Sequence, residues 1–201
     1  MRTKQQYIRN AIEASFIRLL EERPFEKITV KDIVDDCGLT RNTFYNYFED
    51  TYDVVDGFLR EQFMELAERE SSETELTVPQ AMRAVAHFAA EQPKVVSHLF
   101  RSPKREELSC YFDRALRMCV GRAVRLQVGE RRLSEEDQQR ITGVYCHAAT
   151  GLFNDWLRDG MKGSLIEELE QLEALFEGSL EQAIVRASAH SAADNNAGNV
   201  G

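Results

Sequence analysis

Residues 38–50 read GLTRNTFYNYFED, a block that combines glycine, threonine, arginine and asparagine with several aromatic side chains. Arginine and asparagine are rarely buried in a packed core, and a solvent-exposed face rarely contains so many aromatic rings. This mixture is typical of a surface that touches another molecule. The block therefore predicts a contact with a partner outside the chain.

A short helix is predicted immediately before this block. Thr29 is a good N-cap, and Asp32 stands at the third helical position, where it makes a carboxylate variant of the capping box. Gly38 supplies the stop, because glycine readily adopts the left-handed conformation that ends a helix. A longer helix precedes this one and is expected to end near Pro24, since proline cannot continue a helix.

A third helix is predicted over residues 41–48, RNTFYNYF, with Thr40 as its N-cap. Phe44 and Phe48 lie four residues apart on one face, so both can pack on the preceding helices while the opposite face stays in contact with water. Two short helices, a glycine-containing turn and an exposed polar face predict a helix-turn-helix over residues 28–47.

The rest of the chain is also predicted to be helical, because apolar residues recur three and four positions apart and alternating β-branched runs are missing. The fold class is therefore all-α, with an N-terminal three-helix head over residues 1–50 and a larger helical body over residues 51–188. The last helix of the body is expected over about 164–188. The tail, 189–201, has too few apolar residues to pack and is expected to be disordered.

The net charge of −9 is unevenly distributed. Residues 1–48 contain eight Lys or Arg and seven Asp or Glu, which leaves the rest of the chain at −10. Because charges further apart than a Debye length of about 8 Å are screened, a few cations on one face can still bind phosphates. No apolar run approaches the ~18 residues of a membrane span, and the first residues lack the apolar middle of a secretory signal. A cytoplasmic protein without a membrane partner is expected.

The sequence ITVKDIVDDCGLTRNTFYNYF, residues 28–48, resembles the signature of the TetR family of bacterial transcriptional regulators, of the TetR/AcrR type. The resemblance covers roughly residues 5–65, where order, spacing and residue types agree. A looser likeness extends to YCHAATGLFNDWLRDGMKGSLIEELEQLEALF, residues 145–176. The resemblance implies a DNA-binding head and a body that binds a small-molecule effector and forms a dimer.

The predicted third helix has residue types that suit the reading of DNA bases. A recognition helix enters the major groove with its N-terminal residues at the base edges. Arg41 can pair bidentately with guanine, Asn42 can do so with adenine, and the methyl group of Thr43 can contact thymine. The resemblance implies the same positions and adds contacts to phosphates. The predicted DNA-binding residues are Lys4, Thr29, Thr40, Arg41, Asn42, Thr43, Tyr45, Asn46, Tyr47 and Thr51.

Several of these residues also have a purely structural interpretation. Thr29 and Thr40 can serve as helix caps alone, and Tyr45 can be a half-buried aromatic whose hydroxyl meets water. Thr51 stands where the family often carries a lysine that meets phosphate, and the acidic residues around it repel DNA. One of them, Asp50, suits the positive N-terminus of the next helix. This departure leaves open a family member that acts through a protein partner.

The body contains enough aromatic and thioether side chains to line a cavity, and the resemblance implies an effector pocket there. The same side chains can equally be ordinary core. His87 and His147 are further candidate polar anchors. The candidate pocket residues are Phe63, Met82, Phe88, His98, Phe100, Tyr111, Phe112 and Met118.

The last two predicted helices carry apolar arcs that are too wide for a single packing partner. One partner is the body of the same chain. The second is expected to be the same pair of helices in another subunit, which makes a two-fold homodimer. The predicted interface residues are Tyr145, Ala149, Phe153, Leu169, Leu172 and Phe176.

The sequence does not favour an enzyme. It contains no glycine-rich phosphate loop, GxSxG, HExxH or CxxC motif, so no catalytic residue, cofactor or metal is expected. The predicted function is a DNA-binding transcriptional repressor that binds an inverted-repeat operator as a dimer and is released by a small-molecule effector. The alternative is a protein-binding adaptor or co-regulator without ordinary operator binding.

Overall fold

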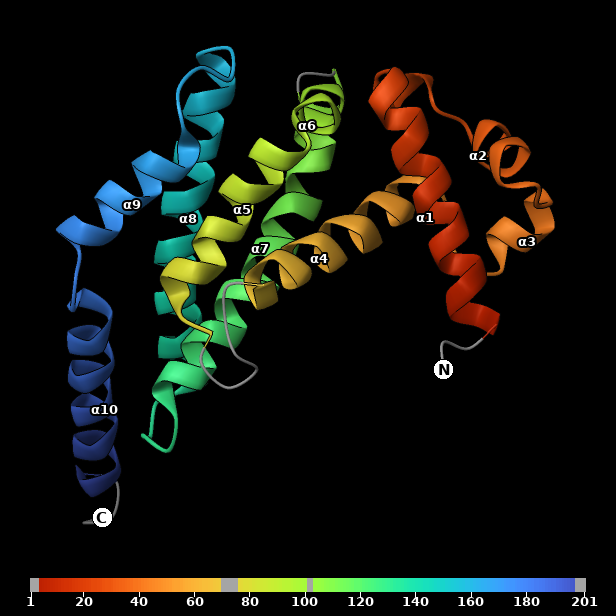
Figure 1. The fold of residues 1–201 in the computed structure, drawn as a ribbon. Coiled ribbons are helices and arrows are strands. Elements are labelled where there is room, and N and C mark those ends of the chain that lie inside the picture. The colour runs from red at the N-terminus through yellow and green to blue at the C-terminus, as the bar shows by residue number, and fades with distance from the viewer. Residues whose placement is uncertain (1–3, 70–75, 101–102, 198–201) are drawn as a thin grey trace. The chain divides into compact units, whose positions relative to one another are not determined.

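The computed structural model describes residues 4–69, 76–100 and 103–197, and all regular structure in these ranges is helical, which confirms the all-α prediction. Figure 1 shows the course of the chain. The elements are α1 (Lys4–Glu22), the 3-10 helix η1 (Phe25–Lys27), α2 (Val30–Cys37), α3 (Arg41–Tyr45), α4 (Thr51–Arg69), α5 (Val78–Glu91), α6 (Pro93–Phe100), α7 (Arg105–Val128), α8 (Glu135–Arg158), α9 (Leu165–Leu175) and α10 (Ser179–Ala197).

Contacts within the chain group it into two compact units. The first contains residues 1–62 and 89–115, and the second contains residues 63–88 and 116–201. Helices α4, α5 and α7 each have residues in both units. This grouping differs from the boundary after residue 50 that the sequence predicted. The physical reason is that α6 packs against α1 and so joins its part of the chain to the first unit.

The core of the first unit forms along one face of α1. Ile12, Phe16 and Leu20 recur every four residues and are fully buried. Helix α1 packs against both α2 and α6. The buried hydroxyl of Ser15 donates to the carbonyl of Ile33 at 3.0 Å, which joins α1 to α2. Since each such apolar side chain contributes roughly 1.5–3 kcal/mol on burial, this face is sufficient to dock α1.

Helix α3 is shorter than the sequence predicted, because the α-helix ends at Tyr45 rather than at residue 48. Beyond that point the backbone tightens into bonds that span three residues, for example from the Tyr47 N–H to the Phe44 carbonyl at 2.9 Å. Phe44 and Phe48 are both buried, as their spacing predicted, and their ring centroids are 5.7 Å apart.

In the second unit, the helix that the sequence predicted as continuous over 164–188 is broken into two helices. Helix α9 ends at Leu175 and α10 begins at Ser179. Gly178, which lies between them, has a φ of 74°, a conformation that glycine adopts without steric cost. Both α9 and α10 pack against α8. The break therefore allows two separate helices to dock on one neighbour.

The end of the chain also differs from the prediction of disorder over 189–201. Helix α10 extends through Ala197. The segment is rich in alanine, the residue with the highest helix propensity, so helix can form there without a packed core. Residues 198–201 lie outside the described ranges.

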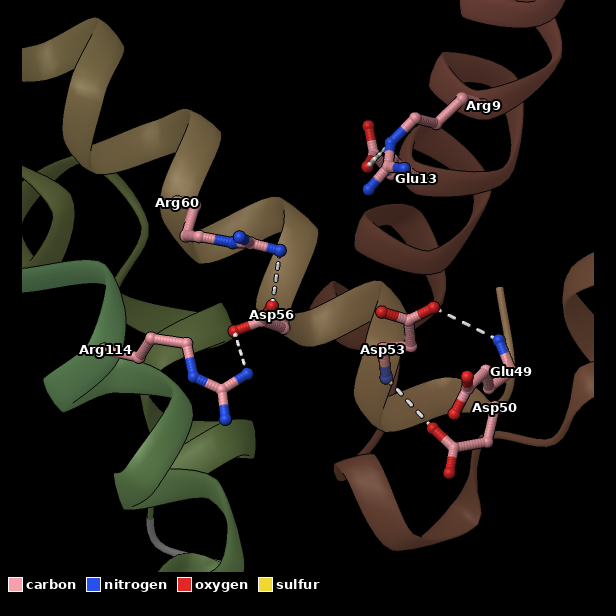
Figure 2. A network of polar contacts seen from close by, with 8 residues as sticks. All are labelled: Arg9, Glu13, Glu49, Asp50, Asp53, Asp56, Arg60 and Arg114. Atoms are coloured by element: carbon pink, nitrogen blue, oxygen red, sulfur yellow. Dashed lines mark hydrogen bonds and ion pairs between the residues drawn. The ribbon is translucent and has the colours of Figure 1, made fainter. Parts of the chain in front are cut away.

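A carboxyl group is buried where α1 meets α4. Glu13 is 7% exposed, and Arg9 Nε donates to its Oε1 at 3.1 Å (Figure 2). Gly57 of α4 makes room for this pair, because a Cβ at that position would lie 2.6 Å from Arg9 Nη2 and 3.0 Å from Glu13 Oε1. Burial raises the pKa of Glu13 to about 7, while Arg9 opposes the rise and the carboxyl of Glu61 adds to it.

This raised pKa predicts a specific pH dependence of stability. The folded pKa lies above the ordinary value of 4.5, so the stabilisation from the bound proton is complete below pH 4.5 and is lost as the pH rises through 7. Replacing Glu13→Gln removes this titration. When the pH is raised from 5 to 8, the wild type should therefore lose about 2–3 kcal/mol of its free energy of unfolding that the variant does not lose.

Urea denaturation at both pH values measures the difference. Glu61→Gln is the matched control: it leaves the titrating Glu13 in place and removes only its carboxyl neighbour, so it should change the pH dependence less, in the same direction. Identical pH profiles for the wild type and the Glu13→Gln variant would contradict the assignment.

Candidate nucleic-acid interface

The predicted capping box of α2 is present. The Asp32 N–H donates to Thr29 Oγ1 at 3.2 Å, and the Thr29 N–H donates back to Asp32 Oδ2 at 2.9 Å. The bonds from the Thr29 hydroxyl and amide are the main reasons why the pKa of Asp32 is lowered from its ordinary value. Gly38 ends the helix with a φ of 68°. The hydroxyl of Thr29 thus has an intramolecular role, as the structural interpretation proposed.

Helix α3 begins with a similar cap. The Thr43 N–H donates to Thr40 Oγ1 at 3.1 Å, and the two threonine hydroxyls lie 2.9 Å apart. The first helical residues after this cap, Arg41 and Asn42, are exposed. The cap therefore orders the start of α3 while leaving its first two side chains free to face a partner.

The residues predicted to contact DNA all lie at the surface of the first unit. The exposed ones are Lys4, Thr29, Thr40, Arg41, Asn42, Tyr45 and Asn46, and the half-buried ones are Thr43, Tyr47 and Thr51. Tyr45, at 56%, is among the most exposed large aromatic residues of the described chain. Residues 40–47 are brought together by α3 itself, while Lys4 opens α1 and Thr51 opens α4.

The cations of the head separate into paired and unpaired groups. Arg18 of α1 forms an ion pair with Asp36 at 2.5 Å, and Arg23, directly after α1, forms one with Asp32 at 3.3 Å. Both pairs therefore link α1 or the residues after it to α2. Within the described chain, exposed Lys27, Lys31 and Arg41 show no ion pair. Sequence reasoning missed the two lysines as site residues, although their position on either side of the Thr29 cap was the available signal.

The acidic residues at the start of α4 are used in capping. Asp50 Oδ1 accepts from the N–H groups of Tyr52 and Asp53 at 2.8 and 2.9 Å. Asp53 Oδ2 accepts from the Glu49 N–H at 3.1 Å (Figure 2). Carboxylates in this position stabilise a helix N-terminus through its unpaired amides and its dipole. The structural role predicted for Asp50 is therefore observed.

The candidate pocket residues are divided between the two units. In the second unit, the rings of Phe63 and Phe88 are buried with centroids 5.6 Å apart. In the first, the buried rings of Phe100 and Phe112 lie 5.3 Å apart, and His98 Nδ1 is 2.6 Å from the carbonyl oxygen of Leu20. The remaining candidates range from buried Met82 and half-buried Tyr111 to exposed Met118. These positions fit core packing, and the pocket remains a proposal.

The predicted interface residues differ in their exposure. Ala149, Phe153 and Leu169 are buried within the chain itself, and their place in a dimer interface stays a prediction. Tyr145 and Leu172 are half-buried. The large apolar residues that α8 to α10 leave exposed are Val144, Leu175, Phe176 and Val185. Sequence periodicity identified the helices but did not separate the inward side of each arc from the outward side.

No group of three or more His, Cys, Asp or Glu side chains is placed to hold a metal ion within the described ranges. A search of the same ranges finds no helix with the length and apolar character needed to cross a membrane.

Comparison with protein families identifies the class of this fold. Residues 15–56 match the family model for bacterial regulatory proteins of the tetR family, and residues 76–178 match a model of TetR type described as a transcriptional regulator C-terminal region. The chain belongs to the TetR family of bacterial transcriptional regulators. No curated protein sequence matches it.

Solved structures share this fold at low sequence identity. The dihydroxyacetone kinase operon activator DhaS superposes with a TM-score of 0.58 at 18% identity, over 87% of this chain and 96% of that one. NalD of Pseudomonas aeruginosa, described as the secondary repressor of the MexAB-OprM multidrug efflux pump, gives 0.52 at 18%, over 90% and 97%. A tetR-family regulator from Streptomyces coelicolor gives 0.50 at 17%, over 94% and 90%.

The capping box allows a direct test of the role of Thr29. Thr29→Ala removes both bonds of its hydroxyl and should lower the free energy of unfolding by about 1 kcal/mol, the usual cost of losing an N-cap. Thr29→Ser keeps a hydroxyl in the same place and should stay close to the wild type. Urea denaturation of the three proteins makes the comparison. Equal stability of the alanine variant and the wild type would show that the cap contributes nothing.

Proposed function

We propose that this protein is a cytoplasmic transcriptional repressor that binds an inverted-repeat operator as a homodimer through α3 and is released by a small-molecule effector. The observation that carries this proposal is the start of α3, where Arg41 and Asn42 are exposed directly after the Thr40 cap. An arginine and an asparagine at the beginning of a docked helix suit direct reading of guanine and adenine in the major groove.

The phosphate contacts are proposed to surround this reading helix. Tyr45 and Tyr47 would donate their hydroxyls to the DNA backbone, and Lys27 and Lys31 would add charge beside the start of α2. The hydroxyl of Thr29 already donates to Asp32 Oδ2 at 2.6 Å. We therefore propose that the backbone amides at the start of α2, rather than this hydroxyl, contact the phosphate. The effector is proposed to bind among the candidate pocket residues of the body, and no catalytic function is proposed.

A protein-binding adaptor is the second candidate. It is favoured by Thr51, which stands in place of a phosphate-binding lysine, and by the exposed carboxylate of Glu49 beside it. Asp50 and Asp53, which cap α4, add two more carboxylate side chains beside Thr51. Fold alone does not set the direction of regulation, since the similar structures include an operon activator and a repressor.

Two substitutions should separate base contacts from phosphate contacts. Arg41→Ala should weaken operator binding by about 1–3 kcal/mol and relax the preference at one base pair of each half-site. Tyr47→Phe removes a phosphate contact, so it should weaken all sequences alike. Selection of operators from random DNA, followed by titration of each variant, provides both readings.

Arg41→Lys is the matched control because it keeps the positive charge but not the bidentate geometry. It should retain non-specific binding while losing the base preference. If Arg41→Ala and Tyr47→Phe alter the selected motif equally, the assigned roles are wrong. If the wild type selects no motif and binds DNA only non-specifically, the adaptor is favoured.

The homodimer is proposed to form through the apolar residues that α8 to α10 leave in water. Leu175 is 81% exposed and Phe176 is 58% exposed, on either side of the end of α9. Val144 on α8 and Val185 on α10 are also more than half exposed. Large exposed apolar side chains on helices that pack against one another are typical of a surface that another subunit covers.

Phe176→Asp should dissociate the dimer. Burying a Phe is worth roughly 1.5–3 kcal/mol, and a two-fold interface contains the substitution twice. Light scattering should give the wild type twice the chain mass of 23.0 kDa and the variant the single mass. Leu126→Asp changes another exposed apolar residue, on α7, and should remain dimeric. A wild type of single mass that still binds its operator would contradict the proposal.

A further inference from the structure

Helices α4 and α7 are joined by a series of polar and aromatic contacts within the first unit. The Tyr52 hydroxyl donates to Glu107 Oε2 at 2.5 Å, and the rings of Tyr52 and Tyr111 lie 6.1 Å apart. Further along, Arg114 Nη1 lies 3.3 Å from Asp56 Oδ1. These residues recur three or four positions apart on each helix, so they lie on one face of α4 and one face of α7.

Asp56 is the buried member of this series, with its side chain 5% exposed. Two arginines bind it at once. Arg60, one turn further along α4, lies 2.6 Å from Oδ2, and Arg114 of α7 approaches Oδ1. Figure 2 shows the carboxylate between these two guanidinium groups. One partner therefore belongs to the same helix, and the other belongs to a different one.

The two partners make release of α7 inexpensive. A buried carboxylate left without a partner is strongly destabilising, but Arg60 stays beside Asp56 whatever α7 does. Arg114 is 59% exposed and its guanidinium lies 5.4 Å from the centre of the Tyr111 ring, so it can be solvated and supported after leaving. The contact between Asp56 and Arg114 can therefore open without leaving an unpaired buried charge.

The contacts between α4 and α7 extend to η1, the segment just before the helix-turn-helix. The ring of Phe25, in η1, contacts Tyr52 at 4.9 Å in an edge-to-face arrangement and contacts Phe16 of α1 at 6.2 Å. Helix α7 is continuous from Arg105 to Val128, and its residues after 115 belong to the second unit. The first turns of α7 are thus connected, through Tyr52 and Phe25, to the buried face of α1, the helix on which α2 packs.

We propose that Asp56 and Arg114 form a latch: α7 is held to α4 while the pair is closed and can detach while Arg60 keeps the carboxylate paired, and the state of the latch sets the affinity of the head for DNA. The last clause rests on the proposed function. Asp56 and Arg114 are positioning residues, since they act on the head through α4.

The latch is tested first in the free protein. Arg114→Gln should raise amide hydrogen exchange at least fivefold in residues 51–60 and 105–114, with the thermal midpoint lowered by only a few degrees. Arg60→Gln is the matched control, because it removes the partner on the same helix and leaves Arg114 as the sole partner of Asp56. It should not raise exchange in 105–114. Unchanged exchange in Arg114→Gln, or equal increases in both variants, would overturn the latch.

Operator DNA selected by the wild type supplies the second measurement. Arg114→Gln should change operator affinity at least fivefold at an unchanged dimer mass, whereas Arg60→Gln should change it less than twofold. Equal affinities in all three proteins would overturn the regulatory role. A wild type that selects no operator would contradict the proposed function instead, and the exchange comparison would still decide whether the latch exists.

Discussion

Helix α3 contains five residues, too few to be stable in isolation, and the burial of Phe44 and Phe48 holds it against the first unit. Everything proposed for the interface depends on these two rings. With them inside, Tyr45 points to another side of the helix than its buried neighbour Phe44, and both Tyr45 and Arg41, in the first turn, are exposed. The guanidinium of Arg9, 4.6 Å from the centre of the Phe48 ring, adds a contact from α1.

The charges of the first unit are arranged so that an acidic chain can still present positive charge locally. The carboxylate of Asp36 pairs with Arg18, which removes an acid from the free surface between α1 and α2. The carboxylates of Asp50 and Asp53 are directed at backbone amides of α4 and its approach. Lys27 and Lys31 have no such partner among the described residues. The net charge of −9 therefore says little about the potential beside α2 and α3.

Helix α4 is attached on two sides by groups that are costly to bury. Toward α1 it offers Gly57, whose missing side chain leaves room for Arg9 and Glu13. Toward α7 it offers Asp56, which is satisfied by arginines from two helices. Because a buried charge is stable only while it is paired, contacts of this kind tend to be either fully made or replaced by another pair. That property suits a helix that contacts both α1 and α7.

Much of the local structure could be predicted from the sequence. The Thr29 and Thr40 caps and the Gly38 stop depend on residues within four positions, so local chemistry was sufficient to find them. Sequence also identified the helical class. Tertiary structure alone decided which side of each apolar arc is buried and which cations are paired. It also placed Arg114 beside Asp56, because such contacts depend on which distant segments meet and no local pattern records that.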